Sequence, residues 1–264
     1  MTLRSHFQDG PRIVFAGEKF DNWLMPPRKN SRRSGRRPPR FPRKIAILYE
    51  DDAIVAIDKP AGLLSVPSKA SDAPSAWTIL AEARKRHKEG TFVVHRIDRF
   101  TSGVLLFAKT HAAREILVRQ FLKHTPVRQY LAVVRGRLAQ REGTMVDHLR
   151  REGMFQKAVR EGDPEATRAE LIYSVERPLR DASLVRVKLV TGLQNQIRVQ
   201  FSRAGHPVIG DRKYRAEEAE ERRIARVALH AAYLEFPHPL TREKVAIESP
   251  LPADMRSLID SLTQ

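Results

Sequence analysis

The chain of 264 residues contains no cysteine, which excludes disulfide bridges, thiolate metal sites and cysteine nucleophiles. It also has no apolar run close to the roughly 20 residues that a membrane helix needs. Phosphate-binding loops of the Gly-x-Gly-x-x-Gly or Walker type are absent. The sequence therefore has no motif that would indicate a nucleotide-cofactor enzyme or an NTPase. None of the nine histidines lies in a metal-binding pattern such as HExxH. We therefore expect no metal and no cofactor.

Acidic residues are few compared with basic ones. The chain has 31 Asp and Glu against 48 Lys and Arg, a formal net charge of +17. Such an excess attracts polyanions, with nucleic acid as the first candidate and an anionic membrane as the second, although a merely solvated surface is an alternative. The N-terminus has no apolar stretch of signal-peptide length. We expect a cytoplasmic protein that does not enter a membrane.

The first 44 residues differ in composition from the rest of the chain. Residues 26–44 contain nine Arg or Lys, five Pro and no acidic residue, and Phe41 is their only large apolar side chain. Such a segment buries too little apolar surface to offset the entropy of ordering. We expect 1–44 to be a mobile basic arm, either an RNA-contacting tail or a linker, and 45–264 to form one folded domain.

Strand patterns outnumber helix patterns in this domain and often follow one another directly. Apolar and β-branched runs predict strands at 45–49, 53–58, 129–135, 169–175, 184–190, 228–236 and 244–248. Helical spacing predicts helices at 77–88, from a Thr110 cap through Leu122, at 195–203 and at 254–262. This order favours an α/β fold of the α+β kind, with a mixed, largely antiparallel central sheet flanked by helices.

The segment VVHRIDRFTSGVLLFAKT, residues 93–110, is more polar than a simple turn requires. Its Ser-Gly pair suits a turn between the apolar runs 92–94 and 104–108. The turn does not need His95, Arg96 and Asp98 within four positions. One interpretation is a turn in which Asp98 binds nearby backbone amides and the two basic residues are exposed. The other is a functional site.

Five segments, in order, resemble blocks of the RluA-type pseudouridine synthases. The motif His-Arg-x-Asp-x-x-Thr-Ser-Gly of that family is similar to residues 95–103, and the preceding block is similar to 47–68. Later blocks resemble 128–136 (RQYLAVVRG), 189–214 and 229–241. The resemblance covers about residues 45–254. It implies the mixed-sheet catalytic domain of that family, a central RNA-binding cleft and isomerisation of uridine in ribosomal or transfer RNA.

The resemblance also implies three catalytic residues. Asp98 matches the aspartate of the family, Tyr130 its active-site tyrosine, and Arg198 the basic residue that pairs with the aspartate. The carboxylate would act at the ribose, as a nucleophile or by removing a proton, and a guanidinium would favour its anion against burial. Tyr130 would stack on uracil or assist loss of the carbon-5 proton; both roles remain open.

Seven further residues of these segments are expected to contact RNA: His95, Arg96, Arg99, Thr101, Arg128, Asn195 and Gln196. A uridine inside folded RNA must be extruded before its glycosidic bond is accessible. Arg96 would then fill the vacated stack or bind a phosphate. The chain departs from the family pattern at Leu193 and Asn195, where Arg and His are usual, and at Arg128, where Lys is commoner.

Three functions compete at this stage. The first is an RNA uridine isomerase, the second a noncatalytic RNA-binding or ribosome-assembly factor on the same fold, and the third a nucleoside hydrolase using Asp98. Presence of all three catalytic residues counts against the second function, and the lack of a general base for water counts against the third. We expect an enzyme that acts as a monomer, with RNA as its partner.

Overall fold

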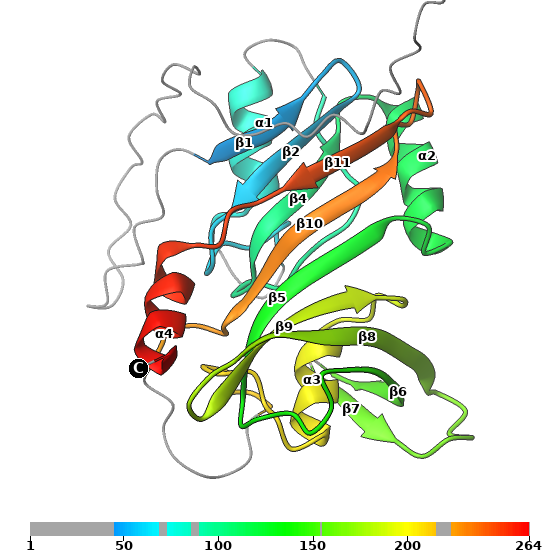
Figure 1. Ribbon diagram of the computed structural model, residues 1–264. Helices are drawn as coiled ribbons and strands as arrows, with labels where there is room; N and C mark the ends of the chain where they lie inside the picture. The colour runs from blue at the N-terminus through cyan, green and yellow to red at the C-terminus, as the bar shows by residue number, and fades with distance from the viewer. Residues whose placement is uncertain (1–44, 69–72, 86–89, 154, 215–222, 264) are drawn as a thin grey trace, which may run out of the picture.

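The computed structural model describes residues 45–68, 73–85, 90–153, 155–214 and 223–263. The basic arm predicted at 1–44 lies outside these ranges. Eleven strands of the described part form one sheet (Figure 1). They are β1 (Ala46–Glu50), β2 (Ile54–Lys59), β3 (Phe92–Val93), β4 (Ser102–Ala108), β5 (Val127–Arg135), β6 (Glu142–Glu152), β7 (Phe155–Val159), β8 (Thr167–Pro178), β9 (Ala182–Leu189), β10 (Leu229–Pro237) and β11 (Lys244–Glu248).

The sheet is mixed and largely antiparallel, as predicted. Its strands follow the order β1-β2-β4-β10-β5-β9-β8-β6-β7, with β11 beside β10 and β3 beside β4. Strand β4 pairs with β10 in parallel, whereas the other described pairs, such as β10 with β5 and β5 with β9, are antiparallel. The helices are α1 (Ala76–Lys85), α2 (His111–Leu122), α3 (Gln196–Arg203) and α4 (Ala253–Thr263). No helix in the described ranges is long and apolar enough to cross a membrane.

Strands β2 and β4 each carry a continuous apolar run, 54–57 and 104–108, because helices cover both of their faces. One face packs against Leu117 of α2 through Ile54, Ala56, Val104 and Leu106. The opposite face packs against Leu80 of α1 through Val55, Ile57, Leu105 and Phe107. A strand covered on both faces shows a continuous apolar run instead of alternation. This packing fixes the strand on which the polar loop 94–101 ends.

The Thr110 cap is confirmed at the start of α2. Its Oγ1 accepts a hydrogen bond from the Ala113 backbone N–H at 3.1 Å. Such a bond satisfies one of the amide groups that have no partner inside the first helical turn. The helix therefore begins where the sequence predicts, one residue after the cap.

The other half of the sheet, from β5 to β7, carries α3 (Figure 1). Ile197 and Phe201 of α3 join the same apolar core as Val133 of β5 and Val187 of β9. Helix α4 adds Leu258, Ile259 and Leu262 to this core. The start of α3 is thereby fixed relative to β5, which brings residues 195–198 close to Tyr130.

The hairpin of β6 and β7 was not predicted. Its eleven-residue first strand alternates between exposed and half-buried positions, and Leu149 is its only buried residue. Strand β7 likewise has no buried residue. Strand patterns are recognised through buried apolar residues, and this hairpin lies at the edge of the sheet with few of them. Backbone pairing with β8 holds it instead.

Gly103 lies at the parallel contact between β4 and β10. Its φ is +110°, and a Cβ atom at this position would lie 2.1 Å from the carbonyl oxygen of Ala231. Residues with a side chain rarely adopt this φ, and here the backbone of β10 occupies the space as well. The sequence Thr-Ser-Gly therefore ends in glycine for a steric reason.

We expect Gly103→Ala to lower the free energy of unfolding by roughly 3 kcal/mol or more, because β4 and β10 must separate. Gly153→Ala is the matched control, since φ is +58° there but nothing lies within 4 Å of the added Cβ. That change should cost only about 1–2 kcal/mol of backbone strain. Chemical denaturation measures both values, and equal losses would contradict the steric argument.

Candidate active site

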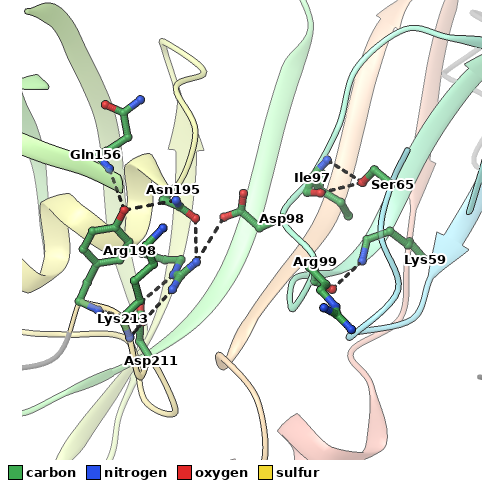
Figure 2. A network of polar contacts seen from close by, with 11 residues as sticks. Lys59, Ser65, Ile97, Asp98, Arg99, Gln156, Asn195, Arg198, Asp211 and Lys213 are labelled. Atoms are coloured by element: carbon green, nitrogen blue, oxygen red, sulfur yellow. Dashed lines mark hydrogen bonds and ion pairs between the residues drawn. The ribbon is translucent and has the colours of Figure 1, made fainter. Parts of the chain in front are cut away.

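Residues 94–101 join β3 to β4 and carry Asp98. The loop is fastened immediately before Asp98 by Ser65, a residue of the segment that follows β2 (Figure 2). The Ser65 hydroxyl donates to the Ile97 carbonyl at 2.7 Å and accepts from the Ile97 amide at 3.1 Å. Immediately after Asp98, the Arg99 carbonyl accepts the Gly62 amide at 2.7 Å. Asp98 is thus held from both sides by the backbone.

Lys59 is a second fastener of this loop. Its side chain is fully buried, and its Nζ donates to the carbonyls of Leu63 at 2.9 Å and of Pro60 at 3.1 Å. A third bond of 3.1 Å goes to the Arg99 carbonyl (Figure 2). Burial lowers the pKa of Lys59 to about 7, against the opposing charge of Asp98. Lys59 directly follows the strand predicted at 53–58 and was not expected to belong to the site. Its role was missed because the three carbonyls converge only in the folded chain.

Arg198 lies between two carboxylates. It binds Asp211 through two bonds of 2.7 Å, from Nε to Oδ2 and from Nη2 to Oδ1 (Figure 2). Its Nη1 lies 3.8 Å from Asp98 Oδ2. The predicted pair of Arg198 with Asp98 is therefore present, but at the outer limit of an ion pair. Asp211, which the sequence analysis did not single out, takes the bidentate position.

Asn195 completes the hold on Arg198. Its Oδ1 accepts from Arg198 Nη1 at 2.7 Å, and its Nδ2 donates to the Tyr214 hydroxyl at 3.3 Å. The residue precedes α3 with a φ of +56°, a left-handed conformation that asparagine tolerates better than most residues. Its side chain does not cap the helix. Asparagine in place of the usual histidine therefore serves to orient Arg198.

A cavity of about 500 Å³ opens beside Asp98. Its lining includes eight of the ten residues predicted for the site: His95, Arg96, Asp98, Thr101, Arg128, Tyr130, Asn195 and Gln196. Arg198 is not among the lining residues, although its Nη1 lies 3.8 Å from Asp98. Arg99 is also off the wall, where its Nε donates to the Gly62 carbonyl at 2.9 Å and its guanidinium lies 5.5 Å from the Phe100 ring centre.

Further walls of the cavity were not predicted. The end of α2 contributes Phe121 and Leu122, and β6 contributes Arg151. Leu193, where the family usually has Arg, also lines the cavity. Strand β6 was itself missed, so no sequence signal placed Arg151 at this site. The cavity has both apolar and basic walls, as suits a base attached to a phosphate backbone.

Asp98 does not behave as an ordinary surface aspartate. Burial raises its pKa above the usual 3.8, although the charges of Arg198, Arg96, Lys59 and Lys213 act in the opposite direction. From the sequence, we expect burial and the guanidinium to oppose each other, with the guanidinium favouring the anion. In the folded chain burial has the larger effect on the pKa, because Arg198 is 3.8 Å away and is shared with Asp211.

Tyr130 and His95 are uncharged at neutral pH. Burial raises the pKa of Tyr130 to about 12, so its phenol keeps its proton. Burial and then the charge of Arg128 lower the pKa of His95 to about 3. The His95 ring stacks on Phe121 at 4.5 Å between centres, and its Nε2 accepts the Leu106 amide at 3.1 Å. His95 is therefore not the exposed charge of the simple turn interpretation.

Gln196 and Thr101 are engaged mainly inside the protein. The Gln196 oxygen accepts from Thr191 Oγ1 at 2.9 Å and from the Leu193 amide at 3.0 Å, while its nitrogen donates to Glu170 O and Gln200 Oε1. These bonds hold the loop before α3. The Thr101 amide donates to the Asp98 carbonyl at 3.1 Å. Both residues shape the cavity wall by fixing its backbone.

Comparison with known proteins agrees with this site. Residues 53–203 match the sequence profile described as RNA pseudouridylate synthase. The RNA pseudouridine synthase YjbO of Bacillus subtilis (strain 168) is 36% identical over 226 residues, which cover 83% of this chain and 76% of that protein. The chain belongs to the RNA pseudouridylate synthase family. The synthase is therefore an isomerase that acts on RNA.

Other relatives of the synthase carry more specific names. Ribosomal large subunit pseudouridine synthase D of Zymomonas mobilis is 33% identical over 83% of this chain and 73% of its own length. The tRNA pseudouridine synthase C of Haemophilus ducreyi is 32% identical over 82% and 95%. The solved structure of human RNA pseudouridylate synthase domain containing 4 has a TM-score of 0.68 at 23% identity, covering 82% of this chain and 92% of that one. This last match supports the fold.

In the described part of the synthase, no group of three His, Asp or Glu side chains is arranged to hold a metal ion.

The two carboxylates around Arg198 should respond oppositely to neutralisation. Because the pKa of Asp98 is raised in the folded state, its protonated form favours folding, and this stabilisation is lost as the pH rises through the folded-state pKa. Asp98→Asn should therefore raise the melting temperature at pH 7. Asp211→Asn leaves the buried Arg198 without its bidentate partner and should cost about 3–5 kcal/mol. Thermal and denaturant unfolding check both, and a loss of stability in Asp98→Asn would contradict the burial argument.

The rate of the chemical step should fall on the acid side with a midpoint above pH 3.8, because the raised pKa belongs to Asp98. Arg96→Gln should move that midpoint upward, since the charge of Arg96 lowers the Asp98 pKa. Single-turnover rates at saturating enzyme, measured from pH 3.5 to 9, provide the test. Loss of the Lys59 proton acts on the alkaline side and is separable. A midpoint at or below pH 3.8 would contradict the assignment.

Proposed function

We propose that the synthase converts uridine to pseudouridine in a ribosomal or transfer RNA, with Asp98 acting at the ribose of a nucleotide turned out of its helix. The observation that carries this proposal is the Asp98 carboxylate beside a cavity of about 500 Å³, with Arg198 at 3.8 Å. A cavity of this volume is in the range that holds small organic ligands. The names of the relatives include both kinds of RNA, and the net charge of +17 suits either.

The chemistry requires the N1–C1′ bond of uridine to break and a C5–C1′ bond to form. Asp98 either attacks C1′ or removes a ribose proton, and both routes start from an ionised carboxylate. Arg198 favours that form by its charge, and Asp211 and Asn195 keep it in position. The reaction consumes no second substrate, since the same base leaves and returns.

Tyr130 supplies a ring on the cavity wall and a phenol that remains protonated. We assign it to stacking on uracil and to donating a hydrogen bond. Because its pKa is about 12, a phenolate base for the C5 proton is disfavoured. Arg96, exposed beside Asp98, is placed to fill the space of the extruded nucleotide or to bind a phosphate.

Residues 45–264 form the catalytic domain in this proposal, and 1–44 an accessory RNA-binding arm. The cytoplasmic location and the monomeric state stay predictions. A noncatalytic RNA-binding role has no observation in its favour, because the carboxylate, its guanidinium partner and the cavity are all in place.

The test is incubation with uridine-containing ribosomal and transfer RNA transcripts, followed by digestion to nucleosides and mass spectrometry. The expected product is pseudouridine. No product would support a binding factor, and free uracil would support a hydrolase. Asp98→Asn should lower the rate by roughly 10³-fold or more, because no other group performs its step. Asp181→Asn, an exposed carboxylate paired with Arg223, is the control and should keep full activity.

A further inference from the structure

We infer that Arg128 is a further catalytic residue, whose guanidinium holds the negative charge of the uracil while it is detached from ribose. The inference rests on the proposed function and adds the group that receives the base. It concerns a position where the family more commonly has lysine.

Arg128 is a buried guanidinium without a carboxylate partner. The structure describes four buried arginines, and three of them bind an acid: Arg84 with Glu50, Arg198 with Asp211 and Arg226 with Asp254. Arg128 is 9% exposed, yet among the described residues no carboxylate oxygen lies within 4.0 Å of its nitrogens. A buried charge without a counterion costs several kcal/mol in a folded protein. Such a cost is expected where a charge is kept for a ligand or a reaction.

The existing contacts of Arg128 are weak. Its Nη2 lies 3.3 Å from the Thr191 carbonyl and 3.5 Å from the Val190 carbonyl, and its Nε has no hydrogen-bond partner. Burial accordingly lowers the pKa of Arg128, but an arginine still keeps its proton at neutral pH. The side chain therefore has donor capacity that the protein does not use.

Arg128 lies on the wall of the cavity that would hold the reacting base. Arg128 and Tyr130 are two residues apart on β5, so their side chains share one face of the strand. Both line the cavity together with Asp98. Gly192 leaves the room for this arrangement, because a Cβ there would lie 2.2 Å from Arg128 Nη1. The guanidinium and the tyrosine ring thus belong to the same wall.

The chemistry creates a negative charge at this wall. When the N1–C1′ bond breaks, its electron pair stays on N1 of uracil and spreads through the conjugated ring onto O2, O4 and C5. Carbon 5 then donates a pair to C1′, and the C5 proton is lost. The uracil is anionic between these steps, whether C1′ is held by Asp98 or has lost a ribose proton nearby. A cation beside O2 or O4 stabilises this stage more than the neutral base.

The alternative is that Arg128 binds a backbone phosphate. In that case its removal weakens RNA binding and lowers the salt dependence of binding, with little effect on the chemical step. The two roles are thus distinguished by measuring affinity and single-turnover rate separately.

The test compares Arg128→Gln and Arg128→Met with the unchanged synthase on a transcript that the latter modifies. We expect the single-turnover rate at saturating enzyme to fall by about 10²–10³-fold, the usual effect of removing one donor to a developing oxyanion. The dissociation constant should change by less than about threefold, because in this role Arg128 contacts the base and its removal breaks no phosphate contact. Arg186→Gln is the control and should keep both values, since Arg186 pairs with Leu131 across β9 and β5 and so lies on the face opposite Arg128 and Tyr130.

Two further measurements exclude a merely structural role. Arg128→Met removes a buried unpaired charge and should raise the melting temperature while the rate falls. The rate defect of Arg128→Gln should also shrink on RNA containing 5-fluorouridine, whose glycosidic bond breaks with less help because fluorine stabilises the uracil anion. The measured step there is cleavage of the N1–C1′ bond.

The inference fails if Arg128→Gln keeps the normal single-turnover rate, loses only affinity, or loses rate and melting temperature together in both variants. Absence of pseudouridine with the unchanged protein would instead refute the proposed function, so the two failures are distinguishable.

Discussion

Sharing of one guanidinium between two carboxylates is the interaction on which the site depends. Asp211 takes the bidentate contact with Arg198 at 2.7 Å, and Asp98 receives the remaining interaction at 3.8 Å. Complete pairing would leave Asp98 as a stable anion of low reactivity. Partial pairing leaves it a half-buried acid with a raised pKa that is still close to a positive charge. Asp211 therefore influences the chemistry by limiting how strongly Arg198 pairs with Asp98.

The backbone around Asp98 is fixed before RNA arrives. Ser65 binds the residue before it, and Lys59 with Gly62 binds the residue after it. These bonds are buried or partly buried, and each would cost about 1–3 kcal/mol if one partner were left unsatisfied. A carboxylate held in this way does not need to be ordered during the reaction, so binding energy remains for extruding the nucleotide.

Most of the fold could be predicted because its elements carry apolar patterns. The strand at 244–248 has the predicted bounds, and α2 begins after its predicted Thr110 cap. The β6–β7 hairpin could not be predicted, since backbone pairing at a sheet edge leaves little trace in side-chain polarity. For β6 and β7, the information that determines the strand lies in the neighbouring strand and not in the segment itself.

Some residues of the candidate site could likewise be predicted from the sequence, and others could not. The resemblance to the family pointed to Asp98, Tyr130 and Arg198, and the structure places Asp98 near both of the others. It did not point to Lys59 or Asp211, whose partners lie up to 40 residues away in sequence or are shared with another acid. The sequence also led us to expect that the guanidinium outweighs burial at Asp98, whereas the pKa is raised, because that balance depends on the 3.8 Å gap and on burial.

The contact between β4 and β10 has a consequence for the geometry of the site. Asp98 belongs to the half that contains β2 and β4, and Arg198 belongs to the half that contains β9 and α3. Strands β4 and β10 are paired at two positions, Ser102 with His230 and Gly103 with Ala231. Leu234 and Phe236 of β10 also pack in the same apolar cluster as Val104 and Leu106 of β4. The gap between the carboxylate and the guanidinium is therefore set by side-chain packing between distant parts of the chain.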